Sequence, residues 1–188
     1  GTKGATLAVN TTGSINSRIK PNTDSKFSYG TYEGTGSAAT IGHGLGVVPE
    51  FILIKMINTQ PTSGFDWTVY HKDNTSSPET DYLVLNSTAA TVDNTFFNDT
   101  APTNAVFSIG TADVVNKDNR HYQFYAFASV KGFSKMGTYT GNANANGTFV
   151  NLGFKPAWAL IKKTSGAEAW QIVDNKRSPV NVMDEGLR

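Results

Sequence analysis

Short stretches in which apolar and polar residues alternate recur along the chain, separated by clusters of Gly, Asn, Asp, Ser and Pro. Alternation with a period of two residues is typical of β-strands that bury one face. It is clearest in Trp67–His71 and Tyr122–Ala128. No window of eleven residues shows the 3.6-residue period of an amphipathic helix. The pattern therefore predicts an all-β fold with little or no helix.

Two further strands are predicted where the apolar residues are continuous. They are Phe51–Met56 and Trp158–Ile161, which follow Pro49 and Pro156. Continuous apolarity indicates strands covered on both faces. The cluster 116–119 lies between two strand-like segments and predicts a hairpin turn. Short strands with Gly- and Asn-rich turns favour a β-sandwich or jelly-roll-like architecture.

Parts of the sequence occur twice. Gly-Thr-Tyr-x-Gly occurs at 30–34 and 137–141, and Pro-x-aromatic-x-Leu-Ile-Lys at 49–55 and 156–162, both at an offset of 107 residues. Trp67–Tyr70 matches Trp170–Val173 at an offset of 103, which requires only a slightly shorter loop. Two elements that share one offset predict an internal repeat.

This repeat of about 107 residues divides the chain into three segments. We expect a linker or attachment segment at 1–26, a first β-repeat at 27–132 and an incomplete second β-repeat at 133–188. The second copy is incomplete because no strand-like segment follows Asp174 to match those at 82–86, 106–110 and 122–128. Either the chain is truncated, or the partial copy completes its sheet with another chain.

Composition narrows the function classes. The net charge is +1 and no three consecutive residues share a charge, so the sequence predicts no basic face and no binding of nucleic acid. There is no cysteine, which excludes disulfides, zinc–thiolate sites and cysteine nucleophiles. The longest apolar stretches have five to six residues, too short for membrane insertion. Eleven Phe, seven Tyr and three Trp supply bulk for a core.

The residues that bear chemistry are dispersed. His43, His71 and His121 lack the spacing of metal ligands, and the clusters 93–94 and 98–99 fit turn caps better than a calcium site, so no metal or cofactor is predicted. A polysaccharide hydrolase needs two carboxylates held close together. The sequence offers candidates but pairs no two of them, and no catalytic residue is predicted. The candidates are Glu33, Glu50, Asp66, Asp81 and Asp99.

Aromatic side chains could bind sugar rings. Trp67, Trp158 and Trp170 occupy positions that are aromatic in both copies, so we interpret them as core residues. Aromatics outside the repeated positions are the better candidates for ligand binding. These are Tyr29, Phe65 and Phe97.

The segments 28–34, 41–55 and 67–71 resemble a repeated β-domain of tail-fibre and structural virion proteins of marine bacteriophages. The resemblance covers about residues 27–174, and Gly42-His43-Gly44-Leu45-Gly46 with the following Pro-x-Phe-Ile is its most specific part. It implies a location on the virion surface, with other virion proteins as partners. Since such fibres usually assemble as trimers, it also implies a homotrimer. It implies no activity.

The leading hypothesis is therefore a virion surface protein, namely a fibre, head-fibre or decoration subunit, that acts by adhesion without catalysis. Two alternatives remain open. One is a carbohydrate-binding module for host surface glycans, and the other is a polysaccharide-degrading tailspike.

Overall fold

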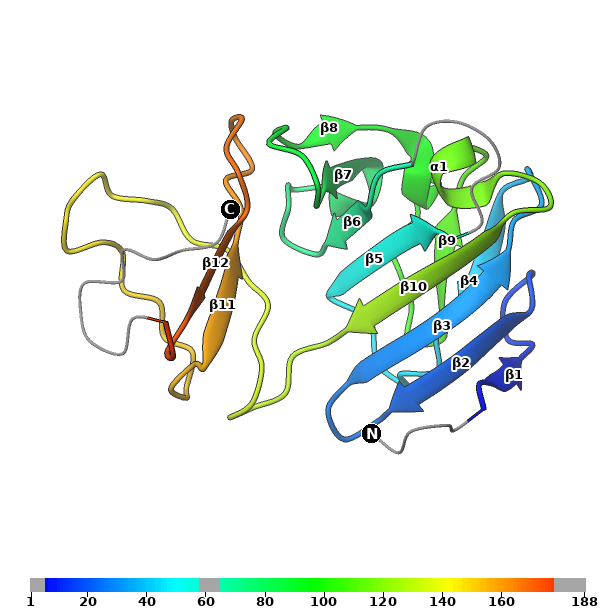
Figure 1. Cartoon of the computed structure of the whole chain (residues 1–188), viewed down its shortest axis with the longest axis horizontal. Helices are drawn as coiled ribbons and strands as arrows, with labels where there is room; N and C mark the ends of the chain where they lie inside the picture. Colours follow the sequence, from blue (N-terminus) through cyan, green and yellow to red (C-terminus); the bar gives the residue numbers. More distant parts are fainter. Residues whose placement is uncertain (1–5, 58–64, 178–188) are drawn as a thin grey trace.

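A computed structural model describes residues 6–57 and 65–177 of the chain (Figure 1). Strands account for 35% of the described residues and helices for 6%, which confirms the all-β prediction. Eight strands form one sheet in which all pairs are antiparallel. In spatial order they are β1 (Ala8–Asn10), β2 (Ser17–Asn22), β3 (Phe27–Glu33), β10 (His121–Phe127), β5 (Phe51–Met56), β6 (Thr68–His71), β7 (Asp81–Val84) and β8 (Val92–Asp93).

A smaller second layer covers one face of this sheet. It contains the pair β4 (Ala39–Gly42) and β9 (Val106–Ile109), which Figure 1 shows behind the large sheet. The helical turns are η1 (Pro78–Thr80), η2 (Thr95–Phe97) and α1 (Asp113–Asn116). The core lies between the layers, which makes the arrangement sandwich-like. Its buried residues are Ile19, Tyr32, Ile41, Leu45, Ile52, Ile54, Met56, Tyr70, Phe97, Phe107, Ile109, Val115, Tyr122, Phe124 and Ala126.

Strand β10 is the centre of the large sheet. It pairs with β3 along its whole length and with β5 on its other edge. Tyr122 and Phe124 point into the core and are fully buried. The Phe124 ring lies directly over Gly30, where an added Cβ would overlap it, and the Tyr122 ring stacks on Tyr32 with centroids 5.1 Å apart. The residues Gly30-Thr31-Tyr32 are therefore explained by their contact with β10.

Residues 1–26 are predicted to be a linker or attachment segment, but the described part of this segment belongs to the large sheet and is not a linker. β2 pairs with β3 along six residues, and Ile19 is 7% exposed within the core. β1 extends the same sheet. Neither strand contains a sequence motif that occurs twice in the chain, so the spacing of the repeated motifs does not reveal them. Residues 1–5 lie outside the described residues.

The hairpin predicted at 116–119 is also wrong. β9 pairs with β4 in the second layer, and α1 carries the chain from there to β10. The buried side chain of Asn116 holds this crossover in place. Its amide donates to the carbonyls of Ser37 (2.7 Å) and Gly110 (2.8 Å), and its oxygen accepts the Thr35 N–H (2.9 Å). An asparagine that the sequence suggests is a turn residue is therefore a buried bridge between segments.

The C-terminal part contains one two-stranded sheet, β11 (Trp158–Ile161) with β12 (Gln171–Asp174). Trp158 pairs with Asp174, as Phe51 pairs with His71 in β5 and β6. Adding 107 to each residue of β5 and 103 to its partner in β6 gives a residue pair of β11 and β12 in every case. The two hairpins therefore have the same register. The Trp170 indole N–H donates to the Val84 carbonyl (2.8 Å), which joins this hairpin to β7. Residues 178–188 of the predicted second copy lie outside the described residues.

Candidate functional site

The face of the large sheet opposite the core carries a continuous group of aromatic rings. Side chains alternate across a strand, so residues next to the core positions of β3, β10 and β5 point away from the core. In Figure 1 no ribbon of the described residues crosses in front of these three strands. We call this group the aromatic face, and its half-buried rings are Phe27, Tyr29, Phe51, Trp67, His71, Tyr125 and Phe127.

Tyr125 occupies the middle of the aromatic face. Its ring centroid lies 5.2 Å from Tyr29, 6.1 Å from Trp67 and 6.3 Å from Phe27. Phe127 continues the group, 4.9 Å from Phe27 and 6.0 Å from Phe51, because these three residues are paired across β3, β10 and β5. The rings therefore form one surface that spans several strands.

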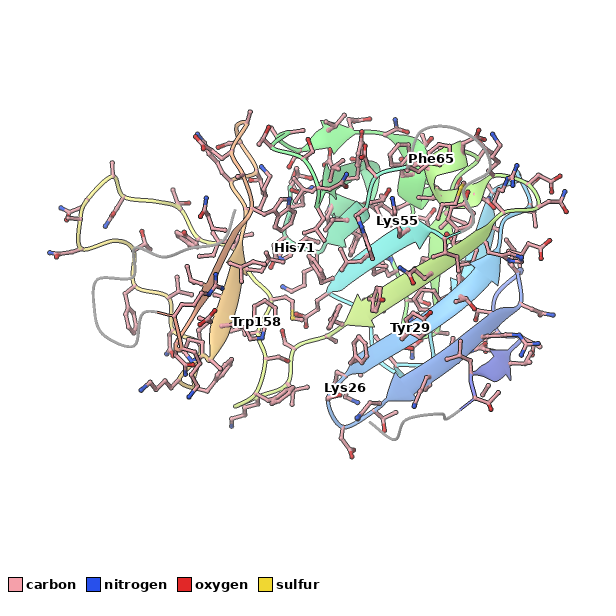
Figure 2. The ribbon with its side chains drawn as sticks, in the orientation of Figure 1. Lys26, Tyr29, Lys55, Phe65, His71 and Trp158 are labelled. Carbon is pink, nitrogen blue, oxygen red and sulfur yellow. The ribbon has the colours of Figure 1, made fainter. Side chains whose placement is uncertain are left out.

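Polar groups accompany these rings. Thr31, Gln123 and Lys55 are the half-buried residues on the same face, towards the other end of the strands. Lys55 donates to the carbonyl of Phe65, which fixes the side chain across the sheet (Figure 2). Burial, and then the neighbouring Tyr29, raises the pKa of Tyr125. A tyrosine hydroxyl is protonated at neutral pH and can donate a hydrogen bond. The aromatic face thus combines the apolar surface of the rings with hydrogen-bond donors.

The structure separates the three aromatics that the sequence suggests for ligand binding. Tyr29 lies on the aromatic face. Phe65 is half-buried and packs against the core. Phe97 is 1% exposed and makes an edge contact with Tyr70, with ring centroids 5.4 Å apart. A surface ligand has no access to its ring, so the prediction is wrong for Phe97.

Sequence reasoning missed most of the aromatic face. The sequence does not single out Phe27, Phe51, Tyr125 and Phe127 as ligand-binding residues. For Phe51 the reason is that the apolar stretch of β5 predicts a strand covered on both faces. The structure contradicts that interpretation, since Phe51, Leu53 and Lys55 are only half-buried. The available signal was in β10, where aromatic residues occupy both alternating sets.

The tryptophans also differ from expectation. Trp67 and Trp170 are half-buried, and Trp67 contacts Tyr125 on the aromatic face. Trp158 is 62% exposed on β11, so its interpretation as a core residue is wrong. Two positions that match in sequence, Phe51 and Trp158, therefore have different environments.

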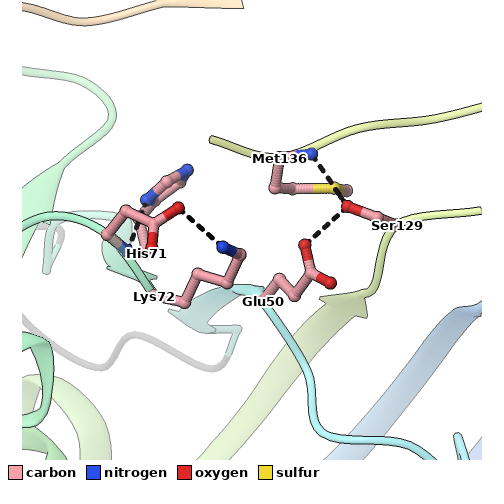
Figure 3. A network of polar contacts seen from close by, with 6 residues as sticks. Glu50, His71, Lys72, Ser129 and Met136 are labelled. Carbon is pink, nitrogen blue, oxygen red and sulfur yellow. Dashed lines mark hydrogen bonds and ion pairs between the residues drawn. The ribbon is translucent and has the colours of Figure 1, made fainter. Parts of the chain in front are cut away.

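A cavity of about 420 Å³ lies beside one end of the sheet, where the chain leaves β10. Figure 3 shows the polar contacts around it. The Ser129 hydroxyl donates to the Glu50 carboxylate (2.5 Å) and accepts the Met136 N–H (3.0 Å). Lys72 forms an ion pair with Asp73 (2.6 Å), whose N–H donates to His71 Nδ1 (3.1 Å). The Ser129–Glu50 bond attaches the segment after β10 to the start of β5, whereas the contacts of His71, Lys72 and Asp73 are local to the end of β6.

The other carboxylates considered for hydrolysis belong to separate elements. Asp66 accepts a hydrogen bond from the Asn86 amide (2.8 Å), and Asp81 accepts one from Thr75. Glu33 lies 3.8 Å from His121 Nδ1. Asp99 lies in the turn after η2, where its backbone φ is +44°. Within residues 6–57 and 65–177, no three His, Asp or Glu side chains gather as metal ligands would.

His43 shapes the turn between β4 and β5. The imidazole is fully buried, its Nδ1 accepts the Leu45 N–H (3.1 Å), and its Nε2 donates to the Thr103 carbonyl (3.1 Å). Burial lowers the pKa of His43 and outweighs the effect of the Thr103 bond. Gly44 and Gly46 have φ near +70°, which other residues rarely adopt. The Gly-His-Gly-Leu-Gly stretch is therefore a structural turn.

The fold and its aromatic face define an all-β protein with an open, ring-lined sheet surface. In the described residues no helix has the length and apolar character needed to cross a membrane. A family model described as a domain of unknown function (DUF7483) matches residues 2–188, and the chain belongs to this family. No curated protein and no solved structure matched the chain.

The fully buried His43 and the half-buried His71 predict how stability depends on pH. Burial lowers the pKa of both His43 and His71, so the unfolded chain takes up protons first as the pH falls. The full stability is present above the unfolded pKa of about 6.5 and decreases below it. Urea unfolding between pH 7.5 and 5.5 should show this decrease. A His43→Gln, His71→Gln double variant should show a weaker one.

The same series tests the role of His43 in the turn. His43→Ala leaves the Leu45 N–H and the Thr103 carbonyl without their side-chain partner, which should cost about 1–3 kcal/mol at pH 7.5. For the pH prediction, an equal decrease of the unfolding free energy in the His43→Gln, His71→Gln double variant and in the natural protein would contradict the role given to these two histidines.

Proposed function

We propose that this chain is a non-catalytic surface protein of a bacteriophage particle, a fibre, head-fibre or decoration subunit that acts by adhesion and by contributing to particle structure. The aromatic face carries the proposal. A continuous group of partly exposed rings on one face of a sheet is a candidate place of contact with another molecule. The resemblance of 41–55 to marine phage virion proteins supports the location, with other virion proteins and further copies in a homotrimer as partners.

The character of the face favours binding without turnover. Its rings sit on regular paired strands, so their positions are fixed before a partner arrives and little ordering cost remains. The candidate carboxylates of the described chain are either engaged locally or lie in turns, as described above. No specific observation favours the tailspike alternative.

A second candidate function is the binding of host surface glycans, and the group Tyr29, Tyr125 and Trp67 favours it. The rings lie 5.2 Å and 6.1 Å apart. Neighbouring rings of this kind can pack against the apolar faces of sugars, while the tyrosine hydroxyls provide polar tips. Gln123 and Lys55 add further donors on the same face. This function is compatible with adhesion by a virion protein.

We also propose that residues 133–188 are an incomplete second copy of the first β-repeat. The common register of β5–β6 and β11–β12 supports this, because register is set independently in each hairpin. The offsets that align these strands are those that align the sequence motifs.

The location is tested on purified particles. Mass spectrometry of virions that encode this chain should recover its peptides in stoichiometric amounts, and antibody labelling should place them on the outside. Absence of the chain from intact, purified virions would overturn the proposal. Its recovery only from the lysate fraction would do so equally.

Glycan binding is tested with three variants of the intact oligomer. A glycan array identifies a ligand, and titration should then show roughly tenfold weaker binding for Trp67→Ala and a smaller loss for Tyr125→Phe, which removes only a hydroxyl. Trp158→Ala is the matched control, because Trp158 is exposed but lies on β11. Equal losses for Trp67→Ala and Trp158→Ala, or an array without binding, would contradict this function.

A further inference from the structure

The outward side chains of the large sheet lie in rows that cross its strands. Side chains of directly paired residues point to the same face of a sheet. In one row Tyr29 of β3 pairs with Tyr125 of β10, which pairs with Leu53 of β5. The next row crosses β2 and the same three strands and is polar throughout. Its members are Arg18, Thr31, Gln123 and Lys55.

A cation stands at each end of this polar row. Arg18 on β2 is exposed, and Lys55 on β5 is half-buried. Neighbouring strands are about 4.8 Å apart, so three strand spacings separate the two backbones by about 14 Å. Thr31 and Gln123 lie between the cations and can both donate and accept hydrogen bonds. A positively charged row therefore borders the rings of the aromatic face, as Tyr29 and Lys55 illustrate in Figure 2.

No acidic side chain of the described residues neutralises these two cations. Within residues 6–57 and 65–177, no carboxylate forms an ion pair with Arg18 or Lys55. Lys55 donates to the Phe65 carbonyl, which carries no charge. At the outward positions of β2, β3, β10 and β5 the one carboxylate is Glu33, which lies 3.8 Å from His121. The positive charge of the polar row is therefore available to an anionic partner.

From this arrangement we infer that the glycan bound by the aromatic face is an acidic oligosaccharide. The inference rests on the glycan binding proposed above and names its substrate class. The apolar faces of the sugars pack on Tyr29, Tyr125 and Trp67. Carboxylate or sulfate groups of the same oligosaccharide meet Arg18 and Lys55.

The chemistry of the two cations favours this ligand. Hydrogen bonds between charged groups are stronger than those between neutral groups, and a guanidinium such as that of Arg18 can bind an oxyanion through two parallel bonds. Because the backbones of Arg18 and Lys55 are about 14 Å apart, a single sugar cannot meet both cations, whereas an oligosaccharide can. Single-stranded nucleic acid also combines negative charge with stacking bases, but it is usually bound in a basic groove. The net charge of +1 makes it the weaker candidate.

Matched pairs of charged and neutral saccharides test the inference. Trigalacturonic acid and its methyl ester share one sugar skeleton and differ in charge. Calorimetric titration of the whole chain at low salt should show roughly tenfold tighter binding of the acid, and about 0.5 M NaCl should remove most of the difference by screening. A galactan tetrasaccharide with and without sulfate esters is the second pair. The pair that shows the preference identifies carboxylate or sulfate as the recognised group.

Charge-removing variants locate the preference on the polar row. Arg18→Gln should weaken binding of the preferred acidic probe roughly fivefold and leave its neutral counterpart unchanged, and the Arg18→Gln, Lys55→Gln double variant should weaken it further. Lys155→Gln is the matched control, because it removes the same charge from an exposed residue outside the large sheet. Trp67→Ala should weaken the binding of charged and neutral probes alike.

Three results would overturn the inference and leave glycan binding by the aromatic face in place. They are equal affinity for the charged and neutral members of both pairs, equal losses for Arg18→Gln and Lys155→Gln, and tighter binding of an oligothymidine single strand than of either acidic probe. Failure of every saccharide to bind would overturn the inference and the glycan function together. The location on the virion is tested separately by mass spectrometry.

Discussion

The pairing of β10 with β3 and β5 is the constraint on which the rest of this structure depends. β10 follows β5 by more than sixty residues and inserts between two strands that precede it. Its inward rings fill the space above Gly30 and beside Tyr32, and its edges satisfy the backbone groups of both neighbours. Without β10, the large sheet would be two separate pieces with open edges.

The same strand also places the proposed binding surface. Because β10 alternates aromatic residues on both faces, one set builds the core and the other builds the centre of the aromatic face. Tyr125 and Phe127 are held by strands whose opposite faces are fully packed. In the part of the chain that the structure describes, the strands of this face are fixed by the packing of their opposite side.

Local patterns in the sequence predict the elements of this fold well and their environment less well. Alternation and turn composition predict the strands Trp67–His71 and Tyr122–Ala128, because strand period is a local property. Which face of β5 is covered depends on the second layer, formed by β4 and β9, and no local pattern reports it. The sequence therefore does not report that Phe51 and Tyr125 share the outward face of the sheet with Tyr29, or that Phe97 is buried. Asn116 is a similar case, since a buried amide and a turn amide look identical in sequence.

Residue-level hydrogen exchange tests the central position of β10 most directly. If β10 holds the sheet together, its amides and their partners in β3 and β5 should exchange slowest, with an opening free energy close to that of global unfolding. Amides of 137–156, which form no strand in the structure, should exchange much faster. Exchange in β10 as fast as that in 137–156 would contradict the account.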